Sequence, residues 1–296
     1  MSEVSCILCG SQQTRLFLDD GTETFNAAAF GSSRKAVSHG RIMRCLLCGF
    51  AFRQLRSTVE EMADLYRYMD PQVYEAEAAG RVKTAFRHFR ILERHQLPGR
   101  VLDVGCASGL FLKLLAGAGW TVEGIEPSET LYRRATTALA DVGRVHCGTL
   151  EQTDLPQASF DAITVWDVLE HVPDPVGFLI RCRSLLKLSG RLFLNVPNLD
   201  SKEARMLGKR WPLLLAEHLN YFNRNSLTIC ARKSGLEWLR FGQRPVSFST
   251  GYILYRMAQH NIPGSSLGSK LARGPLGRIT IPLYMGEVYA VGRRCS

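Results

Sequence analysis

The chain has 296 residues, of which 46% are hydrophobic and 22% are charged. This length allows two domains at most, and the composition is typical of a folded globular protein, which excludes disordered, collagen-like and fibrous chains. No apolar run is long enough to span a membrane, and the first residues lack the regions of a signal peptide, so we expect a cytoplasmic protein. Nine cysteines without an export signal indicate thiols that are buried or metal-bound in a reducing compartment.

Positive charge gathers near the end of the chain. The 37 lysines and arginines outnumber the 27 aspartates and glutamates, and the stretch 243–296 carries seven basic side chains against one acidic side chain. Such an excess suits a nucleic acid, an anionic membrane surface or a phosphorylated substrate. Because no five like charges follow one another, a solvated basic face is an equal alternative.

Two cysteine pairs of equal spacing lie in the first fifty residues: Cys6 and Cys9, then Cys45 and Cys48, each pair followed by glycine. Two intervening residues let one tight turn place both thiolates on a tetrahedral ion, and the glycine lets backbone amides fold toward the sulfurs. The pattern predicts a structural zinc site in a small ribbon-like module over residues 1–55. The alternatives are two chance pairs or a redox motif. A redox pair would lie at the start of a helix that follows a strand, whereas these pairs lie between short strand-like runs.

A connector is expected over residues 56–80, with a helical pattern at 62–66 that Pro71 would end. A longer helix should follow and end near residue 98. Five apolar residues mark one expected face of it, namely Val82, Ala85, Phe86, Phe89 and Leu92.

The residues after this helix have the pattern of a ligand-binding βα unit. A short apolar strand at 100–104 is followed by a glycine-containing turn at 105–109 and an apolar helix at 110–115. This is the first unit of a doubly wound α/β sheet, in which a ligand lies against the turn and the helix N-terminus. A dinucleotide fingerprint is disfavoured, because Ala107 and Leu110 replace two of its glycines. Glu126 ends the next strand, where a carboxylate can accept both ribose hydroxyls.

From about residue 81 to the end, the sequence resembles the class I S-adenosylmethionine-dependent methyltransferases. The first motif of that family matches Asp103, Gly105 and Gly109, with Ala107 in place of the middle glycine. The resemblance implies a Rossmann-like methyltransferase domain over residues 81–296. It also implies that the methionine part of the cofactor lies over Gly105, Cys106 and Ala107, and that Glu126 holds the ribose.

The resemblance extends to three later motifs. Thr149 stands where the family often has an aspartate for the adenine amine, so contact with adenine would fall to the backbone and to Leu150. The strand at 160–165 leads into Trp166 and Asp167, which the resemblance places at the sulfonium end of the cofactor. Residues 185–194 resemble the helix, turn and fifth strand that close the family's core.

Two histidines are candidate general bases for removing a proton from the methyl acceptor. His171 follows the fourth strand, where a structural hydrogen bond to the backbone is an equal explanation. His218 lies in the segment 200–225, where this family inserts substrate-covering elements, and the sequence slightly favours it. A second covering segment is expected over 243–280.

The acceptor is expected to be a small molecule, such as a sugar, a polyketide-like metabolite or a lipid-linked precursor, with O- or C-methylation. No proline-rich motif for a flipped base amine follows the fourth strand, which disfavours a nucleic acid. A module of four cysteines before such a domain resembles both sugar C-methyltransferases and a ribosomal RNA methyltransferase. RNA methylation therefore remains an alternative, as does a non-catalytic scaffold. The sequence leaves the oligomeric state open.

The apolar stretches at 209–215 and 251–258 contain cations and a tryptophan, a composition that suits peripheral contact with an anionic membrane. The alternative is a buried helix with a lid over the acceptor pocket. A loop is expected at 263–277, which is rich in glycine, serine and proline.

Overall fold

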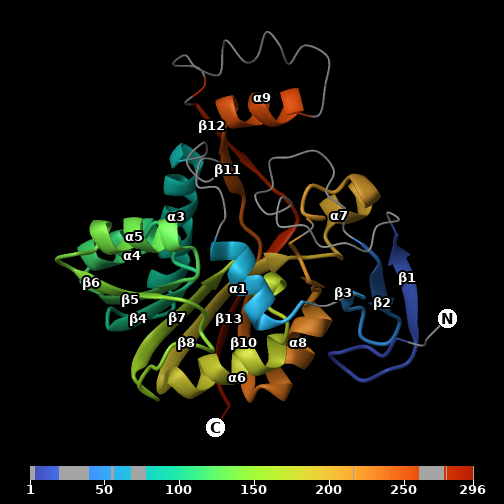
Figure 1. The fold of residues 1–296 in the computed structure, drawn as a ribbon, viewed down its shortest axis with the longest axis horizontal. Coiled ribbons are helices and arrows are strands. Elements are labelled where there is room, and N and C mark those ends of the chain that lie inside the picture. Colours follow the sequence, from blue (N-terminus) through green and yellow to red (C-terminus); the bar gives the residue numbers. More distant parts are fainter. Residues whose placement is uncertain are drawn as a thin grey trace.

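The computed structural model describes residues 4–19, 40–54, 57–67, 78–215, 217–259, 277 and 279–295. Its centre is a seven-stranded sheet (Figure 1) in the order β10-β13-β8-β7-β4-β5-β6. The strands are β4 (Arg100–Val104), β5 (Thr121–Glu126), β6 (Gly143–Cys147), β7 (Phe160–Trp166), β8 (Leu186–Pro197), β10 (Leu236–Gly242) and β13 (Glu287–Arg294). The pairs among β8, β7, β4, β5 and β6 are parallel, whereas β13 pairs antiparallel with β8 and β10. This confirms the predicted Rossmann-like sheet.

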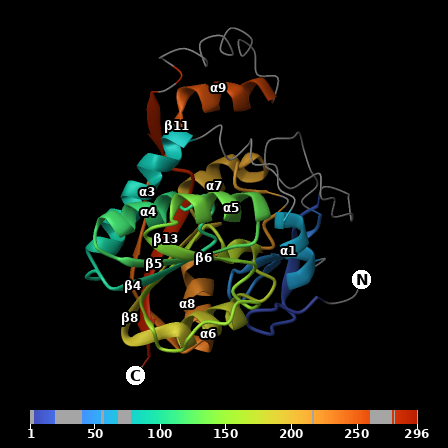
Figure 2. The ribbon, with the colours of Figure 1, turned by 60° about the vertical axis from the view of Figure 1, so that its left-hand side comes forward.

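Helices cover both faces of the sheet (Figures 1 and 2). One face carries α3 (Ala78–Glu93), α4 (Leu110–Gly117) and α5 (Glu129–Ala138), and the other carries α6 (Pro175–Leu185) and α8 (Arg224–Lys233). Side chains alternate along a strand, so Val101 packs into the core on the α3–α4 side and Leu102 into the core on the α6–α8 side. Burial on both faces explains the nearly continuous apolar run of β4.

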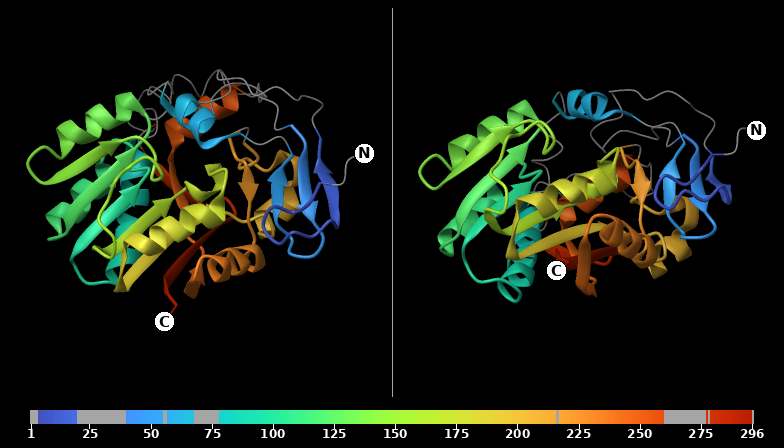
Figure 3. Two further views of the ribbon diagram at one scale, coloured as in Figure 1. Left: turned by 60° about the horizontal axis from the view of Figure 1, so that its bottom comes forward. Right: turned by 90° about the horizontal axis from the view of Figure 1, so that it is seen from below.

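The N-terminal cysteine-containing segment forms a second, antiparallel sheet in the order β1-β2-β3-β9. It contains β1 (Thr14–Leu18), β2 (Ile42–Cys45), β3 (Ala51–Arg53) and β9 (Asn220–Tyr221). Figure 3 shows this sheet beside the larger one. Since β9 comes from residues far beyond the predicted module 1–55, the small sheet is completed by the chain of the methyltransferase part. The described residues include three further helices and a ribbon: α1 (Val59–Arg67), α7 (Lys202–Leu207), α9 (Thr250–Gln259), and β11 (Val246–Ser249) paired with β12 (Thr280–Leu283).

The buried face of α3 matches the predicted one in part. Ala85, His88 and Leu92 are buried, whereas Val82 and Phe86 are 39% and 51% exposed. The helix packs on α4 and β11, and the ring of His88 stacks on Trp166 with centroids 3.9 Å apart. The prediction is thus right for Ala85 and Leu92, and Phe89 packs partly buried against the same core, but it is wrong for Val82 and Phe86, because the histidine at the centre of the packed face interrupts the apolar pattern.

The predicted loop at 263–277 lies outside the described residues, apart from Gly277. The apolar stretch 251–258 forms part of α9, and its side chains are described only as far as residue 254. Among the helices described, none is long and apolar enough to span a membrane.

The position of α3 predicts a contrast in stability between two substitutions. Leu92→Ala should lower the free energy of unfolding by about 2 to 5 kcal/mol, because it leaves a cavity at a fully buried site. Phe86→Ala, the matched control, should change it by only about 0.5 kcal/mol, since half of that side chain is already exposed. Urea denaturation measures both, and equal losses would contradict the assigned face.

Candidate active site

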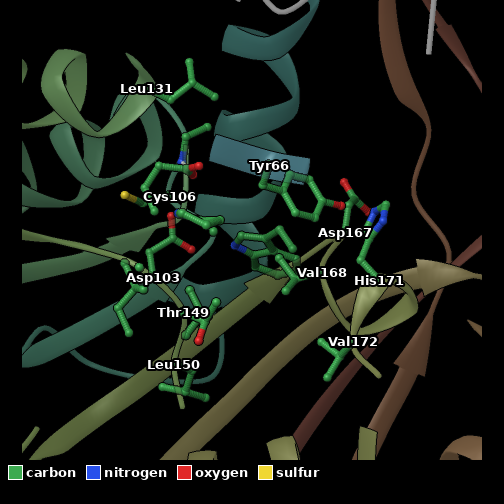
Figure 4. Close-up of a pocket in the computed structure, with 18 of the residues that line it drawn as sticks. Tyr66, Asp103, Cys106, Leu131, Thr149, Leu150, Asp167, Val168, His171 and Val172 are labelled. Carbon is green, nitrogen blue, oxygen red and sulfur yellow. Dashed lines mark hydrogen bonds between the residues drawn. The ribbon is translucent and has the colours of Figure 1, made fainter. Parts of the chain in front are cut away.

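A cavity of about 340 Å³ opens at the carboxyl ends of β4, β5 and β7, the edge at which ligands bind in doubly wound sheets. Figure 4 shows its two sides. Asp103, Cys106, Thr149 and Leu150 lie on one side, and Tyr66, Asp167 and His171 lie on the other. The cavity therefore brings together most of the residues that the sequence selected, from the four segments that follow or end β4, β5, β6 and β7.

The turn after β4 has the backbone that its glycines predict. Gly105 and Gly109 have φ values of 77° and 78°, and Ala107 between them has φ 48°. The amides of Gly105 and Cys106 both donate to the carbonyl of Ile125, at 2.8 and 3.0 Å, which fastens the turn to β5. A Cβ on Gly105 would lie 2.7 Å from Val168 Cγ2, so glycine is required by both conformation and space.

Glu126 is buried at the end of β5 and lines the cavity. Its two carboxylate oxygens accept backbone hydrogen bonds of 2.8 Å, one from Ala107 and one from Ser128. Burial raises the pKa of this carboxyl to about 7, against the lowering effect of the two amides. Each oxygen retains a lone pair for a further donor, so the residue fits the predicted contact with ribose hydroxyls.

Asp103 and Cys106 complete the wall beside Glu126. Asp103 accepts a 2.6 Å hydrogen bond from Thr164, and burial raises its pKa to about 7. A Cβ on Gly124 would lie 2.6 Å from Cys106 Sγ, which shows that the thiol packs into the sheet. Cys106 therefore offers its backbone rather than its sulfur to a ligand.

Thr149 and Leu150 line the cavity beyond β6. The Thr149 amide donates to Gln152 at 3.2 Å, but its buried hydroxyl oxygen has no hydrogen-bond partner in the described part of the chain. An orphaned hydroxyl beside the fully buried Leu150 suits the polar edge and the flat face of a purine, so the site fits an adenine.

Trp166 and Asp167 line the cavity at the end of β7. Asp167 has the unusual φ of 56°, and its carboxylate accepts a 2.5 Å hydrogen bond from the Asn195 amide. Its second oxygen lies 3.9 Å from the Arg244 guanidinium. The described contacts of Asp167 thus run toward β8 and residue 244, on the side of the cavity away from Thr149 (Figure 4).

The two candidate bases are neighbours but differ in position. The His171 and His218 rings are 4.7 Å apart, and their Nδ1 atoms lie 3.0 and 2.9 Å from the carbonyls of Glu217 and Leu213. Only His171 is among the residues that line the cavity. Burial lowers the pKa of His171 to about 4, so its ring is neutral near pH 7. Glu170 also brings a carboxylate oxygen within 4.8 Å of ring nitrogens of both histidines.

Sequence reasoning missed the contribution of α1, which it treated as part of a connector. Val59, Met62, Ala63 and Tyr66 of this helix line the cavity, and the Tyr66 ring meets the His171 ring edge-on at 5.7 Å. Their spacing of three to four residues marks one helical face, and that signal was available in the sequence.

The four cysteines of the N-terminal pairs form one cluster with all sulfurs within 4.8 Å of one another. Cys6 and Cys48 are 3.7 Å apart at sulfur, and Cys9 and Cys45 are 3.6 Å apart. Zinc–sulfur bonds of about 2.3 Å place tetrahedral ligands about 3.8 Å apart, so the cluster fits zinc. The glycine after each pair has a positive φ, and its amide donates to the backbone carbonyl of the first cysteine of that pair.

This cluster is attached to the segment 218–225, in which the His218 ring packs against the cavity residue His171. The amide of Arg53 donates to Leu219 at 3.0 Å, and β3 pairs with β9 immediately after His218. Phe50 packs on Phe222 with centroids 5.2 Å apart, and the Asn225 side chain donates to the carbonyl of Cys48 at 3.1 Å. On its other side, the Leu219 amide donates to the Glu170 carbonyl at 2.9 Å, so the segment that carries His218 is held between the cysteine module and the turn that follows β7.

A model of the methyltransferase domain family matches residues 75–240, more than half of the chain. This chain belongs to the class I S-adenosylmethionine-dependent methyltransferase family. A ubiquinone biosynthesis O-methyltransferase of Thiobacillus denitrificans is 32% identical over 149 residues, covering 47% of this chain and 64% of that protein. One from Xanthomonas campestris is 40% identical over 113 residues, covering 36% and 47%. The chain thus spans between about half and two thirds of these curated relatives.

Solved structures agree with the methyltransferase fold. The [4+2]-cyclase SpnF superimposes with a TM-score of 0.58 and 18% identity, over 81% of this chain and 97% of that one. A methyltransferase of Thermotoga maritima gives 0.53 and 18%, over 78% and 99%. Because a cyclase shares this fold, the fold does not by itself decide the reaction.

The elevated pKa of Glu126 predicts a pH dependence of cofactor affinity. Ribose hydroxyls would donate to the ionised carboxylate, so binding would lower a pKa that is about 7 in the free protein. Affinity for S-adenosylhomocysteine should therefore rise roughly tenfold from pH 6 to pH 8. Glu126→Gln should weaken binding and flatten this profile in calorimetric titrations.

Glu93→Gln is the control, because Glu93 is an exposed carboxylate at the end of α3 and is not among the residues that line the cavity. It should leave the slope in place. A slope that survives in Glu126→Gln would contradict the assigned role of Glu126.

Proposed function

We propose that this protein transfers the methyl group of S-adenosylmethionine to a hydroxyl oxygen of a small-molecule acceptor. The observation that carries the proposal is the single cavity with two chemically different sides. One side has the buried carboxylates and the orphaned Thr149 hydroxyl, and the other has Tyr66, Asp167 and His171. The function for which the relatives are named, O-methylation in ubiquinone biosynthesis, supports oxygen as the reacting atom.

The cofactor would lie along the first side. Its amino acid part would contact the turn of Gly105, Cys106, Ala107 and Gly109 beside Asp103, its ribose would contact Glu126, and its adenine Thr149 and Leu150. Trp166 and Asp167 would border its sulfonium end. When bound, this group supplies an electrophilic methyl, and the protein's task is to align the acceptor with it and exclude water.

The acceptor hydroxyl would be oriented by His171. Its Nδ1 is 3.0 Å from the Glu217 carbonyl, which fixes the proton there and leaves the lone pair on Nε2. Nε2 would accept the hydroxyl proton as the oxygen–carbon bond forms and the sulfur–carbon bond breaks. The ring of His218 meets the His171 ring edge-on with centroids 4.7 Å apart, so His218 is assigned a positioning role.

The N-terminal cluster would bind one structural zinc through Cys6, Cys9, Cys45 and Cys48. With four thiolates, the ion would have no open position for catalysis. Its effect on the active site would pass through β3 and β9, which anchor the segment beginning at His218. Because the cysteine module shares a sheet with β9, we assign it a structural role beside the acceptor side of the cavity and not the role of a separate RNA-binding domain.

Methyl transfer can be tested before the acceptor is identified. Cell extract incubated with the protein and isotopically methyl-labelled cofactor should yield a labelled small molecule, identified by mass spectrometry. His171→Ala should lower incorporation by about 10²- to 10⁴-fold while leaving S-adenosylhomocysteine affinity intact. His95→Ala, in the turn after α3, is the control and should match the wild type. Label found only in RNA, or none at all, would overturn the proposal.

Metal content tests the cysteine site. Cys9→Ser should reduce bound zinc from one equivalent toward zero, lower the unfolding temperature and speed amide exchange at 219–222. Cys295→Ser, an exposed thiol outside the cluster, should change none of these. Zinc content that is unaltered in Cys9→Ser would show that the site is wrongly assigned.

A further inference from the structure

A group of buried polar atoms without hydrogen bonds gathers where β7, β8 and β13 meet. They are the Arg244 Nε, Nη1 and Nη2, the Trp166 Nε1, the His88 Nε2, the Asn195 Oδ1 and the Glu287 Oε2, none of which has a hydrogen-bond partner among the described residues. We call these five residues the Arg244 cluster. So many orphaned polar atoms in one place indicate a missing ligand, because each costs free energy when it is left without a partner.

The Arg244 cluster borders the second side of the cavity. His88 and Trp166 line the cavity directly and stack on each other with an interplanar angle of 5°. Arg244 Nη2 lies 3.9 Å from an oxygen of Asp167, which also lines the cavity. Figure 4 shows Asp167 on the side of Tyr66 and His171, away from Thr149. A ligand group in the cluster would therefore belong to the acceptor and not to the adenosine.

The hydrogen-bonding character of the cluster is mainly that of a donor. Arg244 is only 4% exposed, and its guanidinium offers five N–H groups in a rigid fork, to which Trp166 adds an indole N–H. The carboxylates of Asp167 and Glu287 lie 3.9 Å from Nη2, which balances charge but is too long for a hydrogen bond. The group that would satisfy these donors carries several acceptor oxygens, and a planar fork matches a carboxylate or a phosphate.

A second cation points to the same ligand. The Arg87 guanidinium donates to Ser247 at 2.6 Å and forms no ion pair with the residues that the structure describes. Partial burial and the charge of Arg244 lower the pKa of Arg87, so the two guanidiniums repel each other. One anion between them would relieve this repulsion. Burial also raises the pKa of Glu287 to about 7, so part of its opposing charge is lost near neutral pH.

We propose that Arg244 and Arg87 form an oxyanion subsite, and that the methyl acceptor carries a carboxylate or phosphate group which binds there while its hydroxyl faces His171. This inference rests on the proposed function, since it assigns the subsite to the acceptor. The Trp166 indole would donate a further hydrogen bond, and the neighbouring His88 would shield the anion from water.

Anion binding tests the subsite without requiring turnover. The unfolding temperature of the full chain, saturated with S-adenosylhomocysteine, would be measured in sodium phosphate and in sodium benzoate, at ionic strength held constant with sodium chloride. An anion at ten times its dissociation constant should raise the midpoint by about 3 °C. A rise with phosphate alone would indicate a phosphorylated acceptor, and a rise with benzoate alone a carboxylic acid. No rise above the chloride control with either anion would overturn the proposal.

Substitutions then locate the effect. Arg244→Lys keeps the buried charge but loses the fork, so it should fold and bind the anion at least tenfold more weakly. Arg90→Gln, an exposed arginine on the same helix as Arg87, should respond like the wild type. An anion effect that is unchanged in Arg244→Lys would place the site elsewhere. Failure of S-adenosylhomocysteine to bind would instead refute the proposed function, so the two failures are distinguishable.

Discussion

The hydrogen bond from the Ala107 amide to the buried carboxylate of Glu126 joins the two halves of the cofactor side. It connects the turn after β4 to the end of β5, while the carboxylate's other oxygen accepts the amide that begins α5. A buried carboxylate is costly unless it is bonded, and these two amides offset that cost. Ala107 has a positive φ at this contact, and each carboxylate oxygen retains a lone pair for a further donor.

The second organising feature is a shared sheet. The cysteine module contributes three strands and the methyltransferase part contributes β9, so neither is complete alone. Cys6, Cys45 and Cys48 belong to the same buried core as Leu102 and Ile163 of the central sheet. Disruption of the cysteine cluster would therefore loosen the segment that packs behind His171. Such a coupling suits an enzyme whose acceptor wall comes from residues far apart in the chain.

Sequence reasoning succeeded where the determinants are local. The turn from Gly105 to Gly109, the strand ending at Glu126 and the two cysteine pairs each depend on residues that lie close together in the chain. It failed where distant partners decide. Which stripe of α3 is buried depends on the stacking of His88 on Trp166, and the partner of β3 is a two-residue strand near residue 220. The five residues of the Arg244 cluster come from five different elements or loops, so no short sequence motif marks the cluster.

The central claim is that the cofactor binds at the carboxyl ends of β4, β5 and β6. Amide hydrogen exchange with and without S-adenosylhomocysteine tests it most directly, because it reports each segment separately. We expect S-adenosylhomocysteine to slow exchange at residues 105–109, 127–131 and 148–150. Exchange in β1 and β2 should stay unchanged. Unchanged exchange at the Gly105 turn, or slowing confined to the cysteine module, would contradict it.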